Sequence, residues 1–357
     1  MSSILSHIKV SKILISFVIT LSTMLGYLIF SPYIDKVFWI TAISSFFLCS
    51  GSGALNNYQD RHIDKLLKRT SKRPLPSGSI SEIEVLVQAI LLICLGLTGF
   101  SFTKNALIST LLALIGVICY NGIYTPLKFR TILAIFPGSI CGMIPPLMGW
   151  YAAGAGVGFS ITGDSTNNTV THFFITALFN FGSNINSLNI NSGSDRSIFW
   201  VMAVIGVWQL PHFWLVVLKH ADDYRQSYKK YMLNSMLTLF DILQLRRIVL
   251  IWTLLYSSML IMTPMFYGHL SKLTKWIVVF NGSTLFIVFI VLYFLTSFSV
   301  RLSALKKNAG ITPIIIKKSL LDSLEHCVEN HKLEFIMLNS SMLFFIIILI
   351  CDRLINT

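Results

Sequence analysis

Long runs of apolar residues, separated by short polar connections, make up most of the chain. A helix needs about 20 apolar residues to cross a bilayer, and nine runs are close to that length. They cover residues 13–30, 37–55, 83–103, 106–124, 132–153, 197–218, 248–267, 276–298 and 335–351. The pattern predicts an all-α, polytopic membrane protein that forms one domain over residues 1–357, with nine transmembrane helices.

Two connections are longer than simple turns. Residues 154–196 are rich in Gly, Ser, Thr and Asn and predict a loop insertion on the outer side. Residues 299–334 include a mixed apolar and charged stretch that predicts a short amphipathic helix at the inner membrane surface.

The basic residues indicate the orientation of these helices. The chain has 28 Lys and Arg against 15 Asp and Glu, a formal charge of +13. Charged residues make up only 12% of the chain, about half the share of a soluble domain. The N-terminus and every second connection together hold 22 of the 28 basic residues. The positive-inside rule then places the N-terminus inside and the C-terminus outside. We expect a lipid bilayer as the partner of this chain, and no nucleic acid.

The cysteines give no sign of an oxidising compartment, and the sequence shows no presequence that would direct the chain to an organelle. The six cysteines form no CxxC pair and no close cluster with histidine, which argues against a disulfide framework or a zinc site. The first apolar run is followed by Ser31-Pro32 without a small-residue cleavage site, so we expect a retained helix. The simplest location is a bacterial inner membrane.

Acidic residues are scarce, and three polar residues after the second apolar run are evenly spaced. Asn57, Asp60 and Asp64 lie at i, i+3 and i+7, so they share one face if the second helix continues past Leu55. Two carboxylates and an amide would then converge at the inner membrane surface.

A second acidic pair, Asp222-Asp223, follows the sixth apolar run on the same side. Acidic groups beside basic ones suit a Mg²⁺ ion that bridges the protein to a diphosphate, because Mg²⁺ takes one or two carboxylates together with phosphate oxygens and waters. The candidate metal ligands are Asn57, Asp60, Asp64, Asp222 and Asp223. The candidate diphosphate contacts are Asn57, Arg69, Lys72, Arg73, Lys128 and Arg130.

Simpler interpretations stay open at this point. Topology and lipid head groups account for most of the basic residues, and Asp64 with Lys68 forms an ordinary i,i+4 pair. His212 follows Pro211 inside the sixth apolar run. It is either a polar contact within the bundle or a contact to a porphyrin or its iron.

Four blocks resemble a known family. The stretch NNYQDRHIDKLLKRTSKRPLPSG is similar to the first motif of the UbiA superfamily of intramembrane prenyltransferases, N-[DN]-x-x-D-x-x-x-D. YTPLKFRT, GMIPPLMGW and WQLPHFW followed by DDY resemble more narrowly the heme O synthase branch. Order and spacing agree over most of residues 10–300.

The resemblance implies a nine-helix UbiA-type bundle that transfers the farnesyl group of farnesyl diphosphate to a vinyl group of heme b, with water addition. Asp60, Asp64 and Asp223 would be the catalytic residues, Mg²⁺ the cofactor, and His212 a candidate heme contact. The family context also suggests an association with heme A synthase or terminal oxidase assembly.

The chain departs from the family pattern after DDY. Ser227 stands where other branches repeat an aspartate, as in the heme branch, but the usual prolines of the following segment are missing. Two alternatives stay open: another UbiA-type prenyltransferase acting on an aromatic or quinone precursor, and a membrane heme carrier or transporter without catalysis. A transporter would place its polar groups near the bilayer midplane.

Overall fold

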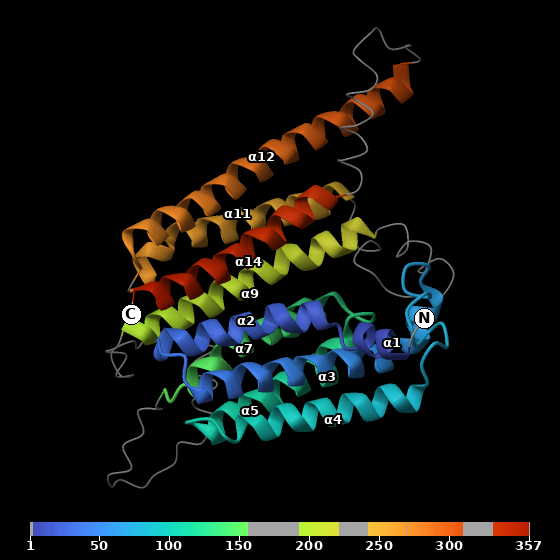
Figure 1. Ribbon diagram of the computed structural model, residues 1–357. Coiled ribbons are helices and arrows are strands. Elements are labelled where there is room, and N and C mark those ends of the chain that lie inside the picture. The colour runs from blue at the N-terminus through green and yellow to red at the C-terminus, as the bar shows by residue number, and fades with distance from the viewer. Residues whose placement is uncertain (1–2, 156–192, 221–241, 269, 310–330, 357) are drawn as a thin grey trace, which may run out of the picture.

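A computed structural model describes residues 3–155, 193–220, 242–268, 270–309 and 331–356. Within these ranges the chain is helical and contains no strand. Figure 1 shows two side-by-side groups of roughly antiparallel helices, with the N-terminus and the C-terminus at opposite ends of the bundle. We call the end that carries the first helix the α1 end.

The first group contains α1 (Ser3–Val10), α2 (Ile13–Phe30), α3 (Lys36–Leu66), α4 (Glu82–Phe100), α5 (Ala106–Val117) and α7 (Ile135–Ala152). A π-helix (Ile118–Tyr124), α6 (Thr125–Leu127) and a 3₁₀ turn (Ile132–Ala134) connect α5 to α7. The second group contains α9 (Gly193–Lys219), α11 (Ile242–Phe266), α12 (Lys272–Ala309) and α14 (Lys332–Ile355). The short helix α1 was not predicted.

Eight helical segments in the described ranges are long and apolar enough to cross a membrane, and each overlaps one of the predicted spans. The fifth predicted span folds as α7, which is not among the eight. Its internal Pro145 and Pro146, and its glycines, dilute the apolar run. The all-α membrane fold is therefore confirmed, while the count of nine crossings stays a prediction.

Close contact between α2 and α7 holds the first group together. A Cβ atom on Gly26 would lie 1.8 Å from the carbonyl oxygen of Pro146, and one on Gly149 would lie 1.8 Å from that of Thr23. Such backbone contact is possible only without a side chain, which is how small residues join helices in membranes.

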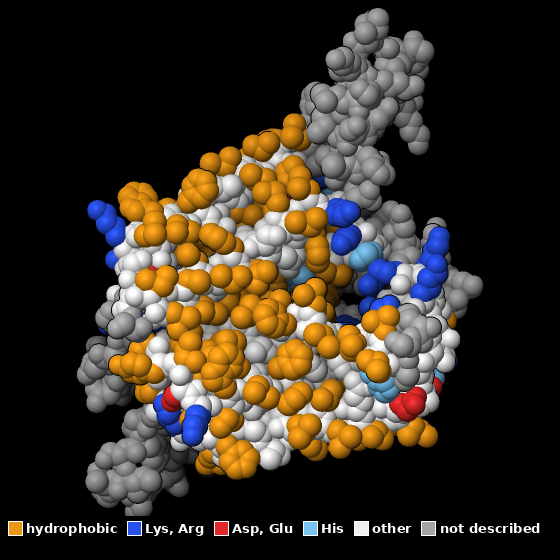
Figure 2. Space-filling view, viewed as in Figure 1, with side chains coloured by type: hydrophobic (Ala, Val, Ile, Leu, Met, Phe, Trp, Pro, Cys, Tyr) orange, Lys and Arg blue, Asp and Glu red, His pale blue; other side chains and the backbone are white. Residues whose placement is uncertain are grey.

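The helix ends have identifiable causes. The carboxylate of Asp35 accepts a hydrogen bond from the Phe38 amide at 2.8 Å where α3 begins. Ser81 and Glu84 form a capping box at the start of α4. Figure 2 shows hydrophobic side chains covering most of the visible face, whereas Lys and Arg gather near the two ends of the bundle.

Both predicted insertions fall mainly outside the described residues. Of the outer loop 154–196, only its two ends are described. Of the inner segment 299–334, residues 299–309 continue α12 and residues 332–334 begin α14. The predicted amphipathic helix therefore lies outside the described residues.

Candidate functional site

The last two turns of α3 carry the acidic residues to the α1 end. Because α3 runs on to Leu66, eleven residues beyond the predicted end, Asn57, Asp60 and Asp64 share one face as expected. They are 6%, 5% and 3% exposed. Charged side chains are rarely this buried unless they are paired, so their partners define the site.

Each of the two carboxylates is paired with a basic residue from another segment. Arg73 donates from Nη1 to Oδ2 of Asp64 at 2.8 Å. The Lys128 ammonium pairs with Oδ2 of Asp60. Asn57 donates from Nδ2 to the carbonyl oxygen of Val10 at 2.6 Å. The structure thus brings together five residues that the sequence predicted to form one site.

The π-helix at 118–124 places Lys128 in this site. Within it, Asn121 donates to the Ser52 carbonyl oxygen at 3.0 Å, which ties the irregular turn to α3. Thr125 accepts a hydrogen bond from Asn56 Nδ2 at 3.0 Å. π-helical turns inside α-helices often occur at functional sites, and here the turn and α6 carry Lys128 to the buried carboxylate.

Lys12 is a basic residue of this site that the sequence analysis counted only for topology. It lies between α1 and α2 in a left-handed conformation, φ 50°, and donates a hydrogen bond to Oδ1 of Asn56. Burial, helped by the positive charges of Lys128 and Arg73, lowers the pKa of Lys12 to about 7. Nothing in the local sequence signals this position, because it depends on how α1 docks against α3 and α4.

The other predicted basic residues lie apart from the carboxylates. Arg69, Lys72 and Arg130 are exposed and form no ion pair with the described acidic residues. They are available to a ligand approaching the α1 end. Asp222 and Asp223 lie outside the described residues.

The buried carboxylates suit Mg²⁺ only if other ligands complete its coordination shell. No cluster of three or more His, Cys, Asp or Glu occurs in the described part of the chain. Mg²⁺ needs only one or two carboxylates when phosphate oxygens and water complete its shell. The two ion pairs involve Oδ2 of Asp60 and Oδ2 of Asp64. The Oδ1 atom of each carboxylate forms no ion pair among the described residues. The residues present fit a Mg²⁺–diphosphate site.

His212 lies in the second helix group, on α9. Its Nδ1 is 2.8 Å from Oδ1 of Asn339 on α14, and its ring centroid lies 4.9 Å from that of Trp208 and 5.3 Å from that of Phe335. The polar contact within the bundle is therefore present, beside a partly exposed aromatic cluster. The next residue, Phe213, meets Tyr124 of the π-helix edge to face, which links this cluster to the first group.

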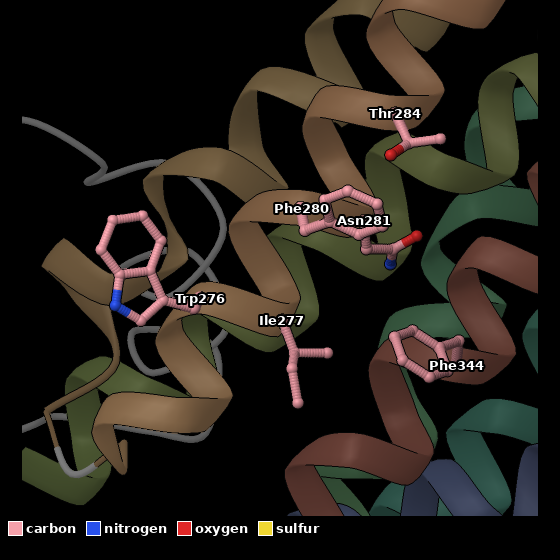
Figure 3. Close-up of a pocket in the computed structure, with 6 residues that line it drawn as sticks. All are labelled: Trp276, Ile277, Phe280, Asn281, Thr284 and Phe344. Carbon is pink, nitrogen blue, oxygen red and sulfur yellow. The ribbon is translucent and has the colours of Figure 1, made fainter.

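A separate groove lies between α12 and α14. Figure 3 shows it lined by Trp276, Ile277, Phe280, Asn281, Thr284 and Phe344. The groove is mostly apolar and lies toward the end of the bundle away from α1, because α12 begins there. It therefore lies apart from the acidic residues.

Comparisons with known proteins agree on one family. The UbiA prenyltransferase family matches residues 17–304. A protoheme IX farnesyltransferase of Geobacter sulfurreducens is 30% identical over 53% of this chain and 56% of its own length. One of Nitratidesulfovibrio vulgaris strain DP4 is 25% identical over 71% of this chain and 74% of its own length. The match thus spans little more than half of the Geobacter relative.

Two solved structures have the same fold. A UbiA homologue of Aeropyrum pernix K1 in its apo form has a TM-score of 0.59 at 15% identity, covering 93% of this chain and 98% of its own. One of Archaeoglobus fulgidus bound to GPP and Mg²⁺ has a TM-score of 0.53 at 12% identity, covering 94% and 99%. The fold and the extent of the family match lead to one conclusion: this multi-pass membrane protein belongs to the UbiA prenyltransferase family.

Proposed function

We propose that the chain transfers the farnesyl group of farnesyl diphosphate to a vinyl group of heme b, giving heme O after addition of water. The observation that carries this proposal is the buried pair Asp60 and Asp64, held by Lys128 and Arg73 at one end of a UbiA-type bundle. The curated relatives named protoheme IX farnesyltransferase support heme as the acceptor.

The residues suit the ionisation of an allylic diphosphate. Asp60 and Asp64, with Asn57 and Asp222 or Asp223, would hold Mg²⁺, which when bound offsets charge on the diphosphate. Lys128 and Arg73 lie beside these carboxylates, and Arg69, Lys72 and Arg130 extend the positive field outward. The allylic C–O bond breaks with its electron pair leaving on the diphosphate, and these positive charges stabilise the departing group.

The acceptor step needs an apolar environment. The π electrons of the vinyl group attack the allylic cation, a C–C bond forms, and a cation is left on the carbon next to the porphyrin. Water adds to that carbon and releases a proton, which gives the hydroxyethylfarnesyl group. The aromatic cluster of Trp208, His212 and Phe335 offers a surface for a porphyrin and limits early access of water.

Mass spectrometry tests the proposal directly. The purified chain is incubated with Mg²⁺, farnesyl diphosphate and heme b, and the product is expected at the mass of heme O. The Asp60→Ala variant is the inactive control and should yield no heme O. A prenylated phenol or quinone precursor in place of heme O would support the other UbiA-type activity.

A heme carrier or transporter without catalysis is the alternative from another class. It would move heme without consuming farnesyl diphosphate. Asp60 and Asp64 lie in the last two turns of α3 rather than at its middle, which favours a site at the membrane surface. We also propose one domain over residues 1–357 in a bacterial inner membrane, N-terminus inside, where heme A synthase or terminal oxidase assembly would receive the product.

A further inference from the structure

A buried cation at the α1 end of the second helix group has one nitrogen without a hydrogen-bond partner in the described part of the chain. Arg246 is 7% exposed, and its Nη2 has no hydrogen-bond partner among the described residues. The nearby Glu334 is hydrogen-bonded to Nδ1 of His331 at 2.6 Å and forms no ion pair with Arg246. Buried charges in proteins are normally paired. Glu334 acts on Arg246 only as a nearby negative charge, so Nη2 of Arg246 is left without an acceptor among the described residues.

Arg246 lines a small cleft between four helices. Its neighbours there include Leu218 of α9, Phe289 and Tyr293 of α12, and Glu334 of α14. The cleft is narrow, with room for little more than a water molecule between these side chains. Pockets that enclose whole drug-sized ligands measure about 300–1,000 Å³, so no macrocycle fits in this cleft, and a ligand would reach Arg246 only with a single polar arm at its mouth.

A second cation lies beside the aromatic cluster, one residue after Leu218 of the cleft. Lys219, the last residue of α9, places Nζ 4.4 Å from the centroid of the Phe335 ring. His212 of the same cluster lies two helical turns, or about 10 Å along α9, before Lys219. Figure 2 shows Lys, Arg and His side chains around a hollow at this end of the bundle.

We propose that Arg246, together with Lys219, binds the propionate carboxylates of heme b; this assignment rests on the proposed function. In heme b the two propionates project from one edge of the macrocycle and the two vinyl groups from the other. Carboxylates held at α9 and α11 would turn the vinyl edge toward the first helix group. Phe213 meets Tyr124 at that boundary, and the Tyr124 carbonyl oxygen accepts a hydrogen bond from the Lys128 amide at 2.9 Å. Arg246 is thus a substrate-orienting residue.

Heme b and its dimethyl ester, in which both carboxylates are blocked, provide the test. Their affinities for the full chain in detergent are measured by Soret-band titration. Wild type should bind heme b about tenfold or more tightly than the ester, as a charge-assisted hydrogen bond provides. Arg246→Gln should lose that difference by weakening heme b alone, and Arg246→Lys should keep part of it. Arg247→Gln is the matched control, because its side chain on the same helix is exposed.

Two results would overturn the assignment. One is equal affinity of wild type for heme b and its ester. The other is an equal loss of affinity for heme b and for its ester in Arg246→Gln, which a folding defect or a lost lipid contact would cause. In turnover, Arg246→Gln should raise KM for heme b and leave KM for farnesyl diphosphate unchanged. If the chain binds heme b more tightly than the ester but forms no heme O, only the proposed reaction is refuted. If it forms heme O but binds both ligands equally, only this subsite is refuted.

Discussion

The ion pair between Lys128 and Asp60 gives the sharpest test of the acidic site. Lys128→Met removes the cation and keeps most of the side-chain volume, so the Asp60 carboxylate is left in a buried position. The two side chains are 14% and 7% exposed. Leaving one partner of a buried pair uncompensated costs about 3–5 kcal/mol.

Neighbouring cations reduce that cost. Lys12 interacts favourably with both Asp60 and Asp64, and Arg73 already pairs with Asp64. We therefore expect the lower limit, a loss of about 3 kcal/mol in the free energy of unfolding for Lys128→Met. The double variant with Asp60→Asn removes both charges and should be more stable than Lys128→Met alone by about 1–3 kcal/mol.

Unfolding in mixed micelles of mild detergent and SDS, followed by circular dichroism, measures these differences. Arg130→Met is the matched control: it removes an exposed charge two residues away and should stay within about 0.5 kcal/mol of wild type. If Lys128→Met unfolds like wild type, or if the double variant loses the sum of the two single losses, the pair is not a buried, coupled one and the reasoning fails.

Three further outcomes are expected. Asp64→Ala and Asp223→Ala should abolish farnesyl transfer while the protein still inserts in membranes; near wild-type heme O yield in either variant removes that residue from the metal site. His212→Ala should impair heme use more than farnesyl diphosphate binding, and an unchanged heme affinity by Soret titration counts against it. Gly26→Ala should lower unfolding stability by about 1–3 kcal/mol, because its Cβ would collide with the carbonyl oxygen of Pro146; a wild-type SDS midpoint would show that α2 and α7 separate easily.

Regular periodicity explains what the sequence predicted well. Apolar runs of spanning length gave the helices, and the i, i+3, i+7 spacing placed Asn57, Asp60 and Asp64 on one face once α3 continued to Leu66. The basic partners Arg73 and Lys128 were candidates because they lie in the two connections on the same side. Their pairing with particular carboxylates could not be read from spacing, since it depends on the path of each connection.

Residues that depend on irregular backbone or on docking escaped the sequence analysis. Lys12 reaches the site only because its left-handed conformation turns α1 back against α3 and α4, where Gln88 donates to Ser11 Oγ at 2.6 Å. The π-helix depends on the contact between Asn121 and Ser52 across 69 residues. Arg246 was assigned to a loop because the apolar run starts at residue 248, whereas α11 begins at Ile242 and buries the side chain.

If the proposed reaction holds, the division of the bundle has a consequence for how the two substrates would meet. The groups suited to the diphosphate lie on α3, α6 and the turn after α3, whereas the aromatic cluster and Arg246 belong to α9, α11 and α14. The two sets are joined through α7 and α9, where the Ser139 hydroxyl donates to the Gly206 carbonyl oxygen at 2.7 Å. In the proposed reaction, the charge that helps the diphosphate leave would lie in the first group, whereas the cation left after C–C bond formation would lie on the porphyrin in the second. A positive residue beside that face would oppose the cation. Lys219, which lies over the Phe335 ring, would therefore have to meet the carboxylate edge together with Arg246, leaving the rings of Trp208 and His212 along the face.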